Sequence, residues 1–233
     1  MATTQKRTAT PNLTAMGAAA WRGVATILAG AAVFFAALVG LARFRDFLAG
    51  SEDVTLAEDV LRAARIEVLA DDRGQVLAGF ILVGVGELLL GVGMWILFTA
   101  VARAESGWRA WVTTTSAWSC LAGGTLSLVF QLWPPMWTGP DSDIAAIGFS
   151  GVTAIGLPIA FALISIGFLG AASVLLTSGT WPRWTGAVLL ISGVLPFITN
   201  LPLFFQVGGV IAGTGLGISA RRARRLPEAA PVT

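Results

Sequence analysis

The sequence predicts an all-α polytopic membrane protein: a bundle of six transmembrane helices with both termini cytoplasmic and an amphipathic helix in the first outer loop. Three observations support this class. Of the 233 residues, 55% are hydrophobic and only 12% are charged, whereas a soluble domain is usually about 25% charged. The 28 Gly and nine Trp suit a bilayer, where Gly lets helices approach closely and Trp lies at interfaces. Most charges flank long uncharged runs.

Four runs in the first three quarters of the chain are long enough for a span, which needs roughly 20 apolar residues. A signal peptide competes for the first run, because Gly40-Leu41-Ala42 is a small-x-small sequence. That run exceeds a normal signal h-region and follows mostly polar residues, which favours a membrane anchor. We expect the third helix to end at Pro134-Pro135, and residues 144–150 to form a loop or interfacial turn. The expected helices are 23–42, 76–102, 110–133 and 151–178.

The last uncharged run, residues 184–220, is too long for one span. As a single helix it would measure about 55 Å, against a hydrocarbon core of about 30 Å. Pro196 and Pro202 bracket Thr199-Asn200, which predicts a tight turn. We therefore expect a fifth helix over 184–198 and a sixth over 203–220.

The placement of basic residues favours this division. Six helices put ten of the 15 Lys and Arg on one side and five on the other, whereas five helices would give six against nine. The positive-inside rule thus predicts six spans with cytoplasmic termini. The expected parts are a cytoplasmic N-terminal tail (1–22), a transmembrane domain (23–220) with a polar outer loop (43–73), and a basic, disordered C-terminal tail (221–233).

The outer loop carries five Arg and eight acidic residues. Thr55-Leu56-Ala57-Glu58 fits a capping box, and apolar residues recur every four positions from Leu56 to Val68. These patterns predict an amphipathic helix over about 55–70 that lies on the outer surface. Paired acids also suit calcium, but the sequence has no D-x-D-x-D-G loop, so we interpret them as a solvated acidic face.

Glu87 is the one charged residue inside a predicted span, where an ionised carboxylate is costly. Gly84 and Gly91 place it on a small-residue stripe that should face another helix. No Arg or Lys shares its depth, so we expect a protonated acid that donates a hydrogen bond. Glu87 is the candidate functional acid, either as a proton or cation relay or as a satisfied interhelical hydrogen bond. The third predicted helix offers a matching stripe of Ser116, Cys120, Gly123, Gly124 and Ser127.

Missing residue types restrict the chemistry. The chain has no His and no Tyr, one Cys (Cys120) and one Lys (Lys6). Without His it cannot supply bis-His haem ligation, a His-containing zinc site or a Ser–His dyad. We expect no enzymatic activity, no metal and no cofactor. We also expect no nucleic-acid partner, because the basic groups flank apolar spans; the expected partners are the lipid bilayer and a second copy or another membrane protein.

Gly209, Gly213 and Gly217 form a small-xxx-small ladder on the sixth predicted helix. Small residues at this spacing let two helix backbones approach closely in a membrane. The ladder therefore predicts tight packing, within the chain or between copies, and we favour packing within the chain.

A basic cluster follows the sixth predicted helix. Such residues attract anionic lipid headgroups, at roughly 1 kcal/mol each, and they also fix topology. Arg183, between the fourth and fifth predicted helices, has the same headgroup or topology role. The cluster consists of Arg221, Arg222, Arg224 and Arg225.

Gly148-Phe149-Ser150-Gly151 resembles the G-x-S-G motif of rhomboid intramembrane proteases, which also have six core helices. In that family a His on the sixth helix activates the Ser. Gln206 stands in the matching position here, and Gln cannot act as a general base. The resemblance thus implies a catalytically dead relative, which we keep as an alternative.

Residues 178–186 form an S-G-x-x-P-R-x-x-G corner between two predicted helices. This corner resembles one in a family of bacterial six-helix membrane proteins, catalogued as a domain of unknown function. The resemblance implies a six-helix topology with a long polar first loop, and it implies no catalytic residues. The most favoured function is a structural or interaction component of the bacterial inner membrane. The alternative from another class is a small proton- or cation-coupled transporter or channel that uses Glu87.

Overall fold

The computed structural model describes residues 13–52, 73–137, 144–199 and 201–223, and side chains within 17–39, 78–132, 156–199 and 201–222. All regular structure in these ranges is helical, as the composition predicts. The helices are α1 (Leu13–Glu52), α3 (Arg73–Ala104), α4 (Trp108–Trp137), α5 (Ile144–Thr177), α6 (Arg183–Thr199) and α7 (Leu203–Ala223).

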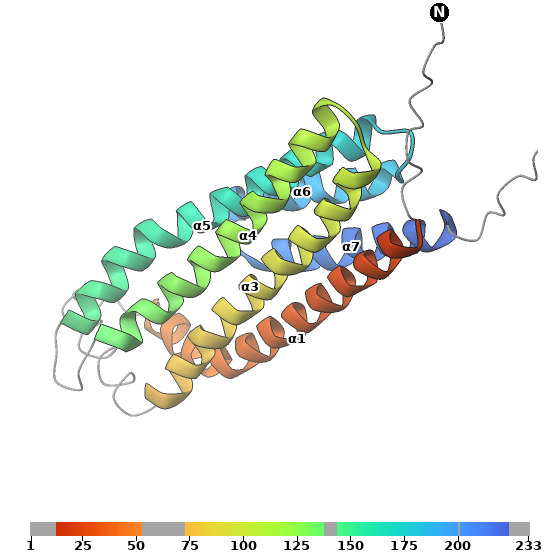
Figure 1. The fold of residues 1–233 in the computed structure, drawn as a ribbon. Coiled ribbons are helices and arrows are strands. Elements are labelled where there is room, and N and C mark those ends of the chain that lie inside the picture. The colour runs from red at the N-terminus through yellow and green to blue at the C-terminus, as the bar shows by residue number, and fades with distance from the viewer. Residues whose placement is uncertain (1–12, 53–72, 138–143, 200, 224–233) are drawn as a thin grey trace, which may run out of the picture.

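Consecutive helices run in opposite directions, so the start of α1 and the end of α7 lie at the same end of the bundle (Figure 1). From α3 onward each helix packs on the next, and α1 packs on α3. α7 returns to pack on α1 and also contacts α3. The chain thus forms an up-and-down bundle that the contact between α1 and α7 closes.

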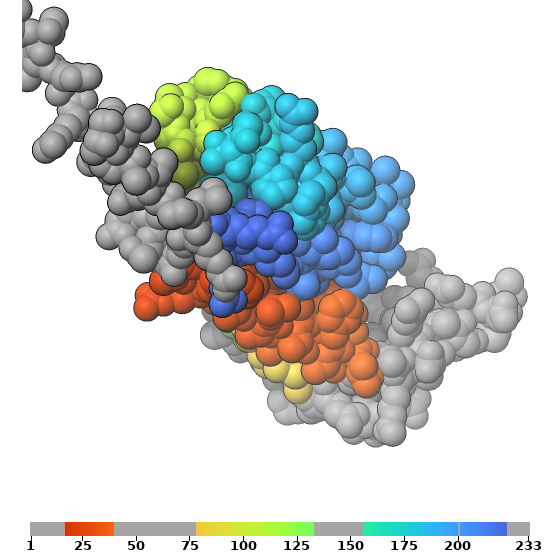
Figure 2. All heavy atoms as spheres, turned by 90° about the vertical axis from the view of Figure 1, so that its right-hand side faces the viewer, coloured from red at the N-terminus to blue at the C-terminus, as the bar shows by residue number. Residues whose placement is uncertain are grey.

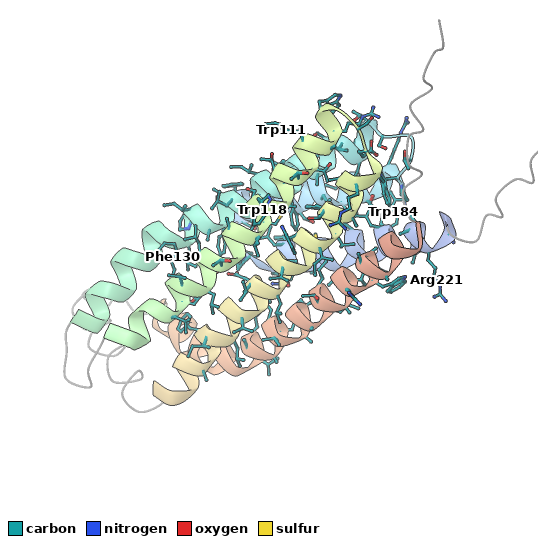
Figure 3. The ribbon with its side chains drawn as sticks, in the orientation of Figure 1. Trp111, Trp118, Phe130, Trp184 and Arg221 are labelled. Carbon is teal, nitrogen blue, oxygen red and sulfur yellow. The ribbon has the colours of Figure 1, made fainter. Side chains whose placement is uncertain are left out.

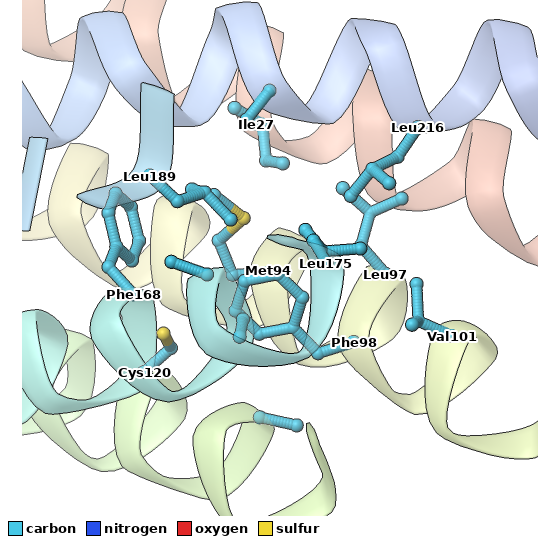
Figure 4. Packing of buried hydrophobic residues seen from close by; sticks show 14 of the residues in the cluster. Ile27, Met94, Leu97, Phe98, Val101, Cys120, Phe168, Leu175, Leu189 and Leu216 are labelled. Carbon is cyan, nitrogen blue, oxygen red and sulfur yellow. The ribbon is translucent and has the colours of Figure 1, made fainter. Parts of the chain in front are cut away.

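The interior of the bundle is mostly apolar, and all six helices contribute to one cluster of buried hydrophobic side chains (Figure 4). Its bulkiest members include Phe98, Phe168 and Phe205, which are almost completely buried. The ring of Phe205 lies 5.8 Å from that of Phe161 and 5.7 Å from that of Phe168, measured between centroids. These aromatic contacts join α7 directly to α5.

Glycines bring α1 and α3 close together. A Cβ built on Gly30 would lie 2.8 Å from the carbonyl oxygen of Gly86. A Cβ on Gly93 would likewise lie 2.8 Å from the carbonyl oxygen of Gly23. Because real Cβ atoms do not approach backbone this closely, these contacts require Gly, as helix pairs in membranes often do.

Four segments of the described chain are long and apolar enough to cross a membrane, which indicates a membrane protein. α6 is also apolar but is shorter, at 17 residues. Large apolar side chains, including those of Val39, Ile166 and Phe197, are exposed on the outside of the bundle, where lipid would cover them. The four segments are Gly17–Val39, Ala78–Ala104, Gly156–Thr177 and Leu203–Arg222.

The first predicted helix is too short at both ends. α1 begins at Leu13, within the predicted N-terminal tail, and continues to Glu52, within the predicted outer loop. The Ala-rich segment before the span and the Leu, Ala and Arg residues after it are good helix formers. Charge therefore ends an apolar run without ending the helix. The amphipathic helix predicted over 55–70 lies outside the described residues, as do Arg224 and Arg225.

Two other predicted boundaries were wrong. α4 continues through Pro134-Pro135 to Trp137: proline has a helical φ, and the hydrogen bonds that its missing N–H removes affect only the last turn of the helix. Residues 144–150 are helical rather than a loop, since no proline or charge interrupts them. The predicted break in the last apolar run is confirmed: α6 ends at Thr199 and α7 begins at Leu203.

Candidate functional site

Glu87 lies near the middle of α3 and is only 1% exposed. The hydroxyl of Ser127, on α4, donates a hydrogen bond to Glu87 Oε2. Glu87 Oε1 is buried and has no hydrogen-bond partner among the described residues. The carboxyl group therefore links two helices through one oxygen and leaves the other oxygen unpaired.

Glycines on both helices make this short contact possible. A Cβ built on Gly91 would lie 2.6 Å from the carbonyl oxygen of Cys120, and one on Gly124 would lie 2.6 Å from that of Glu87. One turn before Glu87 on α3, a Cβ built on Gly84 would lie 3.0 Å from the Cα of Leu128. The α3 and α4 backbones thus approach so closely that a Ser hydroxyl reaches the carboxyl group.

The stripe predicted on α4 divides between two neighbouring helices. Ser127 and Gly124 face α3. Gly123 instead faces α5, where a Cβ would lie 2.7 Å from the carbonyl oxygen of Ala160. The Sγ atom of Cys120 also faces α5, as does the hydroxyl of Ser116, which lies against Gly170.

The surroundings of Glu87 decide what it can do chemically. The six Arg residues whose side chains are described lie toward the end of the bundle where α1 begins, away from the middle of α3. An ionised carboxylate with no cation beside it is costly in an apolar interior. A neutral carboxyl group can instead join the helices and offer its second oxygen for proton exchange. The arrangement suits an interhelical clamp or a single proton-exchange site.

The glycine ladder of α7 packs against side chains of other helices in the same chain. A Cβ on Gly213 would lie 3.0 Å from Ile27 Cδ1, and one on Gly217 would lie 2.9 Å from Val24 Cγ2, both on α1. At Gly209 the nearest atom would be Leu90 Cδ1, on α3, at 2.5 Å. The ladder is thus a contact within one chain, and its described surface is not open to a second copy.

The residues that resemble a rhomboid site show no described contact with each other. Ser150 lies in the first part of α5, and its side chain is outside the described residues. Gln206 is 0% exposed, and neither polar atom of its side chain has a hydrogen-bond partner in the described part of the chain. The hydroxyl of Ser165 is buried and unpaired in the same sense.

A second polar cluster, which the sequence did not predict, joins two loops at the end of the bundle where α1 begins. Ser178, in the S-G-x-x-P-R-x-x-G corner, donates a 2.7 Å hydrogen bond to Glu105 Oε1. The other carboxylate oxygen of Glu105 lies 4.0 Å from Arg109 Nη1. Arg109 Nη2 donates to the carbonyl oxygen of Thr177 over 2.9 Å. This cluster fixes the α3–α4 loop against the end of α5.

One sequence signal could have identified this cluster. Glu105 lies between Arg103 and Arg109 in a connection rich in basic residues, so a single acid there suggests a specific partner. The corner itself has ordinary helix-start contacts, since the Pro182 carbonyl accepts hydrogen bonds from the N–H and the hydroxyl of Thr185. Nothing in the sequence pairs Glu105 with Ser178, which is 73 residues away.

Comparison with protein-family models, curated proteins and solved structures finds no match to this chain. Within the ranges that the structure describes, no three His, Cys, Asp or Glu side chains form a group able to hold a metal ion.

Proposed function

We propose that the chain is a six-span integral protein of the bacterial inner membrane, with cytoplasmic termini, that acts as a non-catalytic interaction component. The charge distribution supports this topology. The start of α1, the ends of α3 and α7, and the starts of α4 and α6 lie at one end of the bundle (Figure 1). Every Arg with a described side chain lies in these segments, as positive-inside topology requires. These residues are Arg22, Arg103, Arg109, Arg183, Arg221 and Arg222.

The observation that carries the interaction role is the outward face of α4. Its exposed residues recur at alternating spacings of four and three, which is the spacing of a helix–helix seam. Trp111 is 70% exposed and Trp118 is 57% exposed, and both lie along α4 in Figure 3. We call this face the α4 seam; it consists of Trp111, Thr115, Trp118, Ala122, Thr125 and Val129.

The α4 seam can be covered by another helix at little polar cost. The hydroxyl of Thr115 donates to the Trp111 carbonyl over 3.0 Å, and that of Thr125 donates to the Leu121 carbonyl over 2.8 Å. Small residues between large ones allow close approach and interdigitation, as in membrane helix pairs. We propose that the α4 seam of a second copy occupies this face, in a two-fold symmetric dimer.

Glu87 fits this function as a clamp. Ser127 and Gly124 lie on the side of α4 that faces α3, so the Glu87–Ser127 contact holds the back of α4 while its seam faces outward. A transporter that uses Glu87 remains the alternative function, which the unpaired Glu87 Oε1 favours. The close backbone contact at Gly91 and Gly124 supports the clamp, because it leaves little room between α3 and α4 for an ion.

Native mass spectrometry of the full chain in lipid nanodiscs tests the dimer. We expect a dimer for the wild type and at least a tenfold lower dimer fraction for Ala122→Trp, because an indole in the middle of the seam prevents close approach. Ile166→Trp, at an exposed position on α5, is the matched control and should leave the dimer intact. A monomeric wild type, or equal loss of dimer in both variants, contradicts the α4 seam as the interface.

A further inference from the structure

The outward side of α7 combines an apolar face with a basic end. Val207, Ile211 and Ile218 are exposed along the helix. Arg221 and Arg222 are exposed at its end, and neither makes an ion pair in the part of the chain that the structure describes. Figure 2 shows the blue atoms of α7 beside the red and orange atoms of α1. We call these five residues the α7 strip.

Two tryptophans lie beside the α7 strip, one from each neighbouring helix. The ring of Trp184, from α6, lies against Gly215. The ring of Trp21, from α1, lies 3.8 Å from the Cβ position of Gly217. Both indoles are partly exposed, and both lie just before the Arg pair, toward the Arg-rich end where Figure 3 labels Trp184 and Arg221. Exposed Trp next to Arg is typical of the headgroup level of a membrane.

The charge at the Arg-rich end of the bundle determines which kind of ligand the α7 strip can bind. Arg22 and Arg183, next to the two tryptophans, are also exposed. Glu105 is the only acid with a described side chain at this end, and it is already bonded to Ser178. A surface with this charge excess attracts an anionic headgroup and not a zwitterionic one. The exposed apolar residues that precede the Arg pair along α7 can contact acyl chains, which a free phosphate lacks.

We propose that the α7 strip binds one anionic phospholipid. The headgroup phosphate pairs with Arg221 and Arg222, Trp21 and Trp184 flank the glycerol region, and the acyl chains lie along Val207, Ile211 and Ile218. Arg presents a fork of N–H donors that matches phosphate oxygens. This site lies on α7, whereas the proposed dimer interface lies on α4, so neither depends on the other.

Native mass spectrometry with added lipid tests the site on the full chain in detergent. Phosphatidylglycerol should bind at least tenfold more tightly than phosphatidylcholine. Arg221→Gln should weaken phosphatidylglycerol binding about fivefold, and Arg221→Gln with Arg222→Gln about 25-fold. Arg103→Gln, which removes one exposed charge from the end of α3 at the same end of the bundle, should change binding less than twofold.

Three results would overturn the proposal. Equal binding of phosphatidylglycerol and phosphatidylcholine removes the selectivity for charge. An effect of Arg103→Gln as large as that of Arg221→Gln shows general attraction to the basic end and no site on α7. Displacement of the lipid by millimolar inorganic phosphate identifies a phosphate site to which the acyl chains contribute nothing.

Discussion

Replacing Gly91 with leucine is expected to destabilise the bundle by about 3 kcal/mol or more, the largest effect of any single change considered. A Cβ at this position would lie 2.6 Å from the carbonyl oxygen of Cys120, and that neighbour is backbone, which cannot rotate away. α3 and α4 would have to separate, and Ser127 would then lose contact with Glu87. The free energy of unfolding in mixed detergent micelles, titrated with sodium dodecyl sulfate, measures the loss.

Gly179→Leu is the matched control for this prediction. No atom lies within 4 Å of a Cβ built on Gly179, which is in the corner between α5 and α6. The same substitution there should change the free energy of unfolding by less than about 0.5 kcal/mol. Equal effects at the two glycines would mean that the close contact between α3 and α4 does not hold the bundle together.

Replacing Ser127 with alanine is expected to cost about 1 to 2 kcal/mol, because it leaves both carboxyl oxygens of Glu87 buried without a described partner. Glu87→Gln should cost less than about 1 kcal/mol, since its amide oxygen still accepts from Ser127. The double variant Glu87→Leu with Ser127→Ala should cost less than the sum of Glu87→Leu alone and Ser127→Ala alone. The free energies of unfolding of the four proteins in this cycle give the coupling.

Additive costs in that cycle would contradict the clamp. Reconstituted liposomes provide the functional comparison. The clamp predicts that Glu87→Gln leaves any proton or cation flux unchanged, whereas a relay through the carboxyl group predicts that the flux disappears. A flux that Glu87→Gln abolishes would support the transporter in place of the interaction component.

The contact between α3 and α4 could be predicted in outline because helical periodicity determines which residues share a face. Gly84, Glu87 and Gly91 lie on one stripe of α3, and the structure places them against α4. The break between α6 and α7 was also predictable, because an uncharged run of that length cannot cross a bilayer once. Periodicity could not show that Gly123 and Ser116 face α5, because one helix in a bundle has two neighbours.

Other features depend on tertiary packing, and no local signal identifies both partners of the contact. The glycine ladder of α7 looks the same in sequence whether a second copy or α1 fills it, and only the return of α7 to α1 decides this. The bond between Ser178 and Glu105 joins the α3–α4 connection to the end of α5, and these two segments meet only once α3, α4 and α5 have packed. The predicted ends of α1 failed for another reason: hydropathy locates a span, whereas helix propensity determines where the helix itself ends.

The proposed sites on α4 and α7 share one requirement, which is that all six helices cross the membrane. Cysteine labelling in spheroplasts with a membrane-impermeant maleimide tests it most directly, because the native Cys120 is fully buried. Ser106 and Thr180 are exposed in connections at the Arg-rich end, and Leu201 is exposed between α6 and α7 at the other end. We expect Leu201→Cys to react in intact spheroplasts, and Ser106→Cys and Thr180→Cys to react only after permeabilisation. Reaction of Leu201→Cys only after permeabilisation would contradict six spans with cytoplasmic termini.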